Sequence, residues 1–329
     1  MENSDSEDGL AGMLAIDDRG TVRRFTAVVA TPVTHGLGEG PVWDAVGRHV
    51  VWVDITAGQV FSGELRPDRS IEIVDHTSFD GTVGAVAIGE DGEWLVAAGE
   101  HVLIRRQNGD IEPGPRIIPP EGRRRLNDGK VDPAGRFVVG TLHLDSDDPI
   151  SETLSVVERD RSVRTLDDDL SLSNGLGWTI DGSRMYSVDT LRRCISVRDY
   201  DPETGSAGPR ATFVHLEEGY PDGLTLDADD HVWVAIWGAG EVHRYAPTGE
   251  LVTVIDVPAP HTSSVAFAGP LLDTLVITTA TQGLDDEALA AFPDSGRVFT
   301  VTPGSLGVPQ PRWGGFSRSA SPTDSEGTA

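Results

Sequence analysis

The stretch Gly175-Leu-Gly-Trp-Thr-Ile-Asp-Gly182, followed by Met185-Tyr-Ser-Val188, decides the fold because versions of it recur along the chain. Each copy opens with Gly or Ser, continues as an apolar run, turns at Asp or Gly and resumes with a second β-rich run. The six copies open at Gly40, Gly84, Gly129, Gly175, Gly223 and Ser264. The steps between them are 44, 45, 46, 48 and 41 residues. A propeller blade takes roughly 40 to 50 residues, so the repeat predicts an all-β, six-bladed β-propeller with four-stranded blades.

The repeat also predicts where the domain begins and ends. An open β-sandwich is the alternative fold, but six near-equal periods favour the propeller. Circular closure needs an outer strand from one terminus, and residues 22–30 can supply it beside residues 297–301. Residues 285–291 are expected to form one short turn of helix. We therefore expect a single domain over residues 17–316, with disordered polar tails at residues 1–16 and 317–329.

Charge and composition exclude several kinds of partner. The net charge is −27 over 329 residues, which repels nucleic acid and anionic membrane surfaces. The chain has no apolar run near the roughly 18 residues that a membrane span needs. Its acidic start lacks the pattern of a secretory signal, so a cytoplasmic location is expected. The one cysteine, Cys194, excludes an internal disulfide framework and a zinc cluster built on cysteines.

The basic residues are unusual in kind. Lys130 is the only lysine, and arginine supplies the rest of the positive charge. A genome rich in G and C would give this bias, and so would adaptation to salt. The sequence is compatible with both causes.

A ring of polar residues precedes the repeat openings. The residues in this position are Glu39, Val83, Asp128, Asn174, Asp222 and Ser263. The innermost strand of a propeller blade starts beside the central axis, so these positions should face one another around the channel mouth. Four of the six carry carboxylate or amide oxygens, and acids gathered on one axis repel each other.

A bound cation would remove this repulsion. A donor set made only of oxygens suits Ca²⁺ or another hard divalent ion. The alternative interpretation is that each residue is the turn former of an Asn-Gly or Asp-Gly pair. The shared register of Glu39, Asn174 and Asp222 favours the metal site.

Other catalytic motifs are missing from the sequence. It has no Gly-x-Ser-x-Gly nucleophile elbow, no phosphate-binding glycine loop and no His-x-x-x-His spacing. His143 follows the second strand of the third repeat and could face the channel, although a surface or core role is the alternative. The strand tryptophans Trp43, Trp178, Trp233 and Trp237 are expected to be core residues more often than ligand contacts. Trp237 stands at a strand end and is the best candidate among them to reach a pocket.

The chain resembles the SMP-30/gluconolactonase family of regucalcin-like six-bladed propellers over roughly residues 37–301. The matching stretches are Gly38-Glu-Gly-Pro-Val-Trp43, Arg125-Leu-Asn-Asp-Gly-Lys-Val-Asp-Pro-Ala-Gly-Arg136, Ser173-Asn-Gly-Leu-Gly-Trp178, Pro221-Asp-Gly-Leu224 and Thr262-Ser-Ser-Val265. The run Asn-Asp-Gly-Lys-Val-Asp is long and specific. The resemblance implies one divalent metal held by Glu39, Asn174 and Asp222.

The resemblance also implies a substrate pocket. It places Arg125 and Asn127 there, with Asn127 near the metal, whereas the repeat register places Asp128 on the axis. We adopt Asn127 for the site and keep Asp128 as a candidate outer partner. Family members commonly carry an acidic residue just after the third-blade strand, and this acid binds sugar hydroxyls. In this chain Asp145 would be that acid, and His143 stands among the expected residues.

The expected reaction is opening of a sugar (aldono-)lactone to the aldonic acid. The metal would act as a Lewis acid, and Asp222 would serve as both ligand and general base. Ca²⁺ is the expected ion, with Zn²⁺, Mn²⁺ and Mg²⁺ as alternatives. A phosphotriesterase-like hydrolase on the same site and a metal-dependent binding or regulatory protein without turnover are the rival functions. The expected partner is the small lactone alone, with the chain a monomer or a small homo-oligomer.

Overall fold

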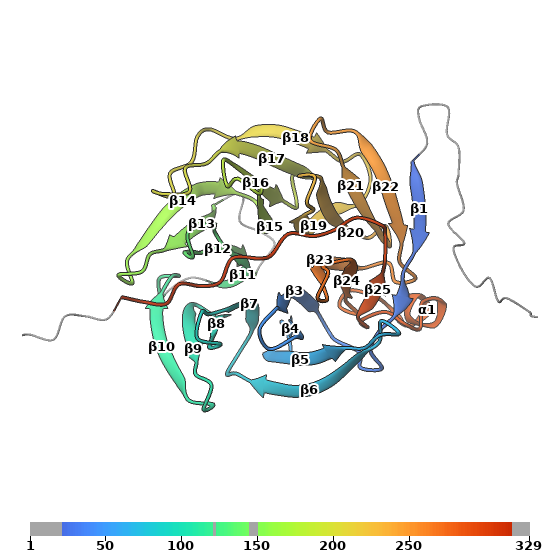
Figure 1. The fold of residues 1–329 in the computed structure, drawn as a ribbon, viewed down its shortest axis with the longest axis horizontal. Helices are drawn as coiled ribbons and strands as arrows, with labels where there is room; N and C mark the ends of the chain where they lie inside the picture. The colour runs from blue at the N-terminus through green and yellow to red at the C-terminus, as the bar shows by residue number, and fades with distance from the viewer. Residues whose placement is uncertain (1–21, 121–122, 145–150, 318–329) are drawn as a thin grey trace, which may run out of the picture.

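Six antiparallel sheets surround a central axis in the computed structural model, which describes residues 22–120, 123–144 and 151–317 (Figure 1). Blade 1 contains β3 (Gly38–Asp44), β4 (His49–Asp54), β5 (Gln59–Leu65) and β6 (Ile71–Ser78). Blade 2 contains β7 (Val83–Ile88), β8 (Trp94–Ala98), β9 (His101–Arg105) and β10 (Ile111–Arg116). Blade 3 contains β11 (Arg124–Val131), β12 (Phe137–His143), β13 (Glu152–Val157) and β14 (Val163–Leu170).

The second half of the ring repeats the pattern. Blade 4 contains β15 (Ser173–Trp178), β16 (Arg184–Asp189), β17 (Cys194–Asp199) and β18 (Ala211–His215). Blade 5 contains β19 (Tyr220–Leu226), β20 (Val232–Trp237), β21 (Glu241–Tyr245) and β22 (Leu251–Asp256), with β1 (Arg23–Thr26) added outside. Blade 6 contains β23 (Thr262–Ala268), β24 (Thr274–Thr279), β25 (Phe299–Val301) and β2 (Val28–Val29). The predicted six-bladed propeller is confirmed.

The N-terminal segment closes the ring, as predicted, but it is shared between two blades. β1 runs parallel to β22 of blade 5, and β2 then pairs antiparallel with β25 of blade 6. Ala27 marks the crossover: its N–H donates to Asp256 O at 2.9 Å, and its small side chain is buried between the two blades. β25 is only three residues long and offers β2 a short partner, so the rest of the segment pairs with the neighbouring sheet.

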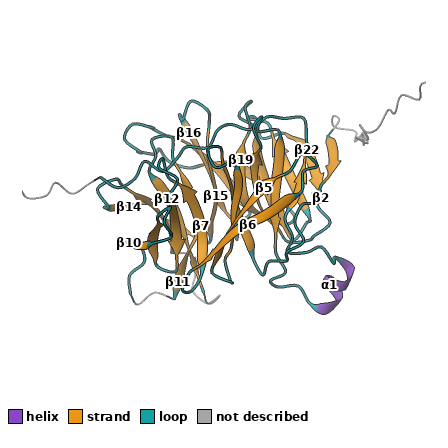
Figure 2. Cartoon of the chain, turned by 60° about the horizontal axis from the view of Figure 1, so that its bottom comes forward, coloured by secondary structure: helices purple, strands orange, loops and turns teal. Residues whose placement is uncertain are grey.

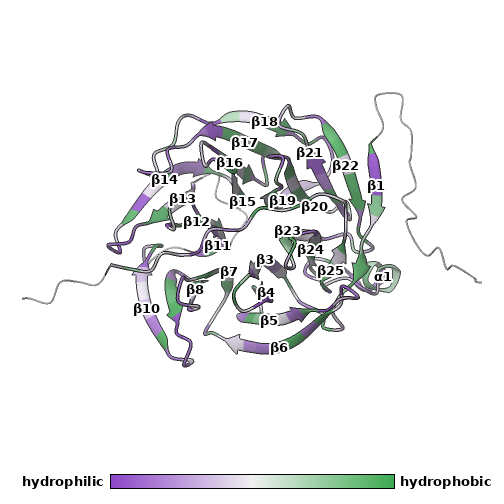
Figure 3. Cartoon of the chain, viewed as in Figure 1, coloured by the Kyte–Doolittle hydropathy of each residue, from purple (hydrophilic) through white to green (hydrophobic). Residues whose placement is uncertain are grey.

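The core lies between neighbouring blades, where each sheet packs its apolar side chains against the next. The inner strands β7 and β8 are buried along their whole length, and Figure 3 shows them in the hydrophobic colour. Outer strands such as β14 consist mostly of exposed and half-buried residues. The inner strands are therefore fixed on both faces, which makes them a rigid base for a site at the axis.

The C-terminal segment 302–317 crosses one end of the channel (Figure 1). Along its path Gly307 N donates to Leu272 O at 2.7 Å, and Trp313 N donates to Ile88 O at 2.9 Å. Trp313 is buried among residues of blades 2 and 3. These contacts lie beyond the C-terminal ends of the innermost strands, so this segment leaves the opposite channel end, where those strands begin, uncovered.

Two smaller expectations concern the helix and the chain ends. The short helix α1 (Asp286–Ala291) stands outside the ring between β24 and β25, as predicted (Figure 2). Asp285 caps it by accepting from Ala288 N at 2.9 Å. Residues 1–16 and 318–329 of the predicted tails lie outside the described residues, whereas Ser317 N donates to Arg159 O at 2.7 Å. Within the described ranges, no helix is long and apolar enough to cross a membrane.

Candidate functional site

A β-bulge interrupts the innermost strand of every blade at the ring of polar residues. The register shifts fall at Glu39/Val42, Val83/Ala85, Leu126/Gly129, Asn174/Leu176, Pro221/Leu224 and Thr262/Ser264. Bulges bend a strand and redirect side chains, and they are enriched next to active sites. The glycines after Asn174 and Asp222 also allow close approach, because a Cβ at Gly175 would clash with Asp222 O and a Cβ at Gly223 would clash with Ser264. The six positions inferred from the repeat therefore occupy one structural slot.

The open channel end contains a cavity of about 260 Å³. Its polar lining includes Glu39, Arg125, Asn127, Asn174 and Asp222, which are five of the seven residues predicted for the site. Its walls are largely apolar. They are formed by Leu37, Ile55, Leu142, Leu172, Leu191, Tyr220 and Trp237. The structure thus combines a charged floor with apolar walls that the sequence reasoning did not anticipate.

Two buried oxygens on the cavity floor lack hydrogen-bond partners in the described part of the chain. They are Oδ1 of Asn174 and Oδ1 of Asp222. The other amide atom of Asn174, Nδ2, donates to Thr190 Oγ1 at 3.2 Å, and Glu39 Oε2 accepts from Gly40 N at 2.8 Å. Buried polar atoms are almost always paired in folded proteins. Unpaired acceptors on neighbouring strands are the arrangement that a cation would satisfy.

The electrostatics of the floor point the same way. Burial raises the pKa of Glu39 well above its usual value, and the negative charges of Asp222 and Asp128 raise it further. Burial likewise raises the pKa of Asp222, with Asp128 adding to the effect. A divalent ion would favour the ionised form of both groups. Three oxygen donors, two of them anionic, fit a hard divalent cation.

Arg125 and Asn127 form a linked pair beside these acids. Arg125 Nη1 donates to Asn127 Oδ1 at 2.7 Å, and Asn127 Nδ2 donates to Ser173 O at 2.8 Å. Burial lowers the pKa of Arg125 to about 10, although the charges of Glu39 and Asp222 oppose this shift. The guanidinium therefore stays positive at neutral pH and presents a fixed cation to the cavity.

The bulge of blade 3 resolves the difference between Asn127 and Asp128. It leaves both residues outside the regular β11–β12 pairing. Asn127 lines the substrate-sized cavity, whereas Asp128 lines a smaller cavity deeper in the channel together with Lys130. Both side chains are buried near the axis, on different levels of the channel.

Two aspartates that the sequence reasoning missed hold the loops in front of the ligand candidates. Asp54, at the end of β4, accepts from Gly36 N at 2.9 Å, just before Glu39. Asp189, at the end of β16, accepts from Leu172 N at 3.2 Å, just before Asn174. The signal was present in the repeat, because both acids end the second strand of their blade.

The remaining predicted residues divide into three cases. Leu142 lines the cavity wall, and the substrate contact of its neighbour His143 stays a prediction. Asp145 lies outside the described residues. Trp237 reaches the cavity, as expected, and stacks on His261 with ring centroids 4.1 Å apart and an interplanar angle of 14°.

A second group of possible metal ligands lies at the β19–β20 turn. Asp227, Asp229 and His231 bring their donor atoms within 4.8 Å of one another. The Asp227 carboxylate already accepts from Trp233 Nε1 at 2.9 Å and from Arg244 Nε at 2.8 Å. Protein donors already satisfy this carboxylate, so we interpret the group as stabilising the turn.

Comparisons with known proteins agree with the fold and the repeat. The family model described as SMP-30/Gluconolactonase/LRE-like region matches residues 37–281. Regucalcin of Danio rerio is 35% identical, covering 83% of this chain and 92% of the relative. The pentonolactonase XacC of Haloferax volcanii is 34% identical, covering 83% of this chain and 93% of the relative.

Solved structures give the same grouping. The calcium-binding protein regucalcin from Agrobacterium tumefaciens superposes with a TM-score of 0.82 at 26% identity, covering 88% of this chain and 98% of the other. A luciferin-regenerating enzyme superposes with a TM-score of 0.80 at 27% identity, covering 88% of this chain and 99% of the other. With this family match over most of the propeller, the chain belongs to the SMP-30/gluconolactonase family.

Proposed function

We propose that this protein is a metal-dependent hydrolase that opens a sugar (aldono-)lactone to the aldonic acid. The observation that carries the proposal is the pair of unpartnered buried oxygens, Asn174 Oδ1 and Asp222 Oδ1, beside Glu39 at the floor of a substrate-sized cavity. The pentonolactonase relative at 34% identity supports lactone hydrolysis as the reaction. The calcium-binding structural neighbour supports Ca²⁺ as the ion, with Zn²⁺, Mn²⁺ and Mg²⁺ as alternatives.

Glu39, Asn174 and Asp222 would hold the ion. A divalent metal in this position supplies Lewis acidity to the lactone carbonyl. Asp222 has a second role in the proposal, because one carboxylate oxygen can take the proton of the attacking water while the other remains a ligand. A bound divalent ion would favour the ionised form of this carboxylate, which is the form that can accept a proton.

The other cavity residues would bind and orient the substrate. Arg125 would attract the ring oxygens and the negative charge that develops during attack, and its hydrogen bond to Asn127 fixes its direction. Trp237 would offer its indole face to the C–H groups of the sugar ring. The leucine and isoleucine walls would limit the water around the reacting carbonyl. His143 and Asp145 stay predicted substrate contacts, and the cytoplasmic location stays a prediction.

The test uses metal-stripped protein and a panel of pentono- and hexono-lactones, with and without Ca²⁺, Mn²⁺, Zn²⁺ or Mg²⁺. Acid release followed with a pH indicator should depend on added metal and should favour one or a few lactones. Phosphotriesters in the same assay serve as the rival substrates. Metal binding without release from any lactone would contradict the proposal. Phosphotriester turnover would then favour a phosphotriesterase-like enzyme, and no turnover at all would favour a binding protein.

A further inference from the structure

The single lysine of the chain lies inside the channel. Lys130 belongs to β11 of blade 3, and its Nζ donates to Leu224 O of β19 in blade 5 at 2.8 Å. The side chain therefore reaches past β15 of blade 4, which stands between these two strands in the ring. Leu224 is the first paired residue after the bulge that presents Asp222. Lys130 thus fastens β19 two residues away from a candidate metal ligand.

The surroundings of Lys130 favour a compact cation. The channel cavity that it lines with Asp128, Leu224, Gly40 and Ser264 has a volume of only about 30 Å³. Such a space holds about one water molecule. This space is what remains with Lys130 in place, and a guanidinium, which is broader and planar, would have to fit into it. All 25 other members of the 26 basic residues are arginine, so the lysine at this position stands against the bias of the whole chain.

Lys130 also enters the charge balance of the channel. Glu39, Asp128 and Asp222 contribute three buried acids, and the neighbouring cations are Arg125 and Lys130. The positive charge of Lys130 lowers the pKa of Asp128, although burial has the larger, opposite effect. Burial lowers the pKa of Lys130 itself to about 8, so the amine is mostly protonated at pH 7.

We propose that Lys130 is a positioning residue for the metal site. Its ammonium fastens β19 across the channel and brings a positive charge to the small cavity that Asp128 also lines. The inference rests on the proposed function for the existence of the metal, but it assigns a role to a residue outside the ligand set. Groups that hold or orient metal ligands from outside typically contribute about 10- to 100-fold to metal affinity.

The variants Lys130→Met and Lys130→Arg test this role by calorimetric titration of the metal-free protein with Ca²⁺ and Mn²⁺. Lys130→Met keeps a side chain of similar length but removes the hydrogen-bond donor and the positive charge. Lys130→Arg keeps the charge but exceeds the space. We expect both to weaken metal binding by about 10-fold or more. The control Arg48→Met removes one positive charge from an exposed turn and should leave the affinity within about twofold.

A second measurement needs no substitution. Protein labelled with ¹³C or ¹⁵N in lysine carries one side-chain ammonium signal, because the chain has one lysine. We expect this signal to shift as metal is added, in step with the calorimetric saturation. Unchanged or tighter binding in Lys130→Met, or a lysine signal indifferent to metal, would overturn the role of Lys130. Failure of the unmodified protein to bind metal would overturn the proposed function as well, and the two failures are therefore distinguishable.

Discussion

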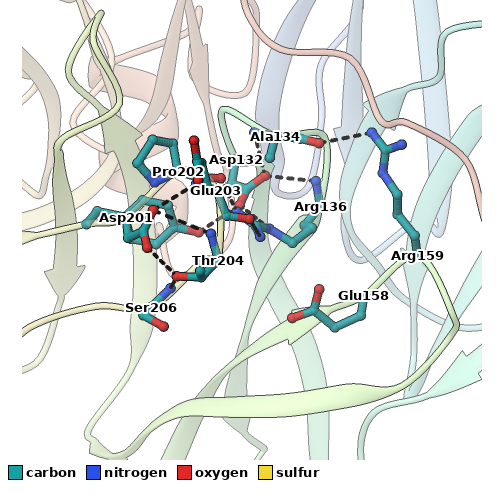
Figure 4. A network of polar contacts seen from close by, with 12 residues as sticks. Asp132, Ala134, Arg136, Glu158, Arg159, Asp201, Pro202, Glu203, Thr204 and Ser206 are labelled. Atoms are coloured by element: carbon teal, nitrogen blue, oxygen red, sulfur yellow. Dashed lines mark hydrogen bonds and ion pairs between the residues drawn. The ribbon is translucent and has the colours of Figure 1, made fainter.

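Two buried polar clusters lie at opposite ends of the innermost strands, and they differ in how completely their polar atoms are hydrogen-bonded. At the covered end, Asp132 accepts from Arg136 N at 2.8 Å, Arg136 Nε at 2.6 Å and Tyr200 Oη at 2.7 Å (Figure 4). Arg136 in turn donates to Pro202 O at 2.6 Å, which ties blade 3 to blade 4. At the open end, Asp222 Oδ1 and Asn174 Oδ1 have no partner among the described residues.

The difference separates a structural cluster from a candidate functional one. A buried carboxylate with a full set of hydrogen-bond donors is already stabilised by the protein and needs no bound ligand. Acids that crowd together with free oxygens cost stability unless a ligand completes them. The Asp132–Arg136 cluster therefore holds blades 3 and 4 together, and the Glu39–Asn174–Asp222 cluster is the one that we propose binds a cation.

The largest expected effect comes from removing the proposed base. Asp222→Asn keeps the size and an oxygen donor but removes the ability to accept a proton. We expect lactone turnover to fall by about 10²- to 10⁴-fold, the usual contribution of general-base catalysis, with the fold retained by circular dichroism. The control Asn108→Asp alters charge at an exposed turn and should leave turnover unchanged. Full activity in Asp222→Asn would refute the role of this carboxylate.

A substitution in the Asp132–Arg136 cluster should affect stability instead of turnover. Asp132→Ala leaves Arg136 buried without its partner, and breaking one side of such a pair typically costs about 3–5 kcal/mol. Urea unfolding should show this loss, while turnover per folded molecule stays close to normal. The control is Asp181→Ala, in the corresponding turn of blade 4, where the carboxylate is exposed and the effect should be small. Similar losses in both variants would remove the distinction between the two turns.

A third prediction concerns pH and the unsatisfied cluster. Glu39 and Asp222 have raised pKa values in the folded protein, so the folded state holds more protons than the unfolded state above about pH 4. The stability of the metal-free protein should therefore fall as pH rises from about 4 through the raised pKa values. Added metal should raise the melting temperature more at pH 8 than at pH 5, because protons compete with the ion.

The control for this pH effect is a double variant in which both acids are replaced by their neutral amides. Glu39→Gln combined with Asp222→Asn removes both titrating groups, so the metal-free double variant should lose less stability over the same pH range. Its melting temperature should also become indifferent to added metal. Equal pH profiles for the double variant and the unmodified protein would show that these carboxylates do not have the raised pKa values described.

The smallest expected effect lies on the cavity wall. Trp237→Ala removes the ring that stacks on His261 and should raise KM for a sugar lactone about fivefold with little change in kcat, since an aromatic contact contributes about 1 kcal/mol. Trp237→Phe should restore most of the affinity. An unchanged KM in the alanine variant would show that the indole does not contact the substrate.

The six blades could be predicted from the sequence, whereas most of the cavity walls could not. Hairpins are local, so the six-fold repeat predicts every blade, and the shared slot predicts Glu39, Asn174 and Asp222 side by side. The division of the closing segment at Ala27 depends on two sheets that are distant in sequence. The apolar wall residues, such as Leu142 and Leu191, resemble ordinary strand residues until the ring is closed. Asp54 and Asp189 could have been found, because they share a register.

The most direct test of the central claim is a calorimetric titration of metal-free protein that counts both ions bound and protons released. The account predicts one divalent ion per chain, with proton release that depends on pH, and loss of binding in Glu39→Gln and in Asn174→Ala. Asp229→Asn changes the separate Asp227–Asp229–His231 group at the β19–β20 turn, and this variant should bind metal normally. Normal binding in the first two variants, or loss of binding in Asp229→Asn, would contradict the account.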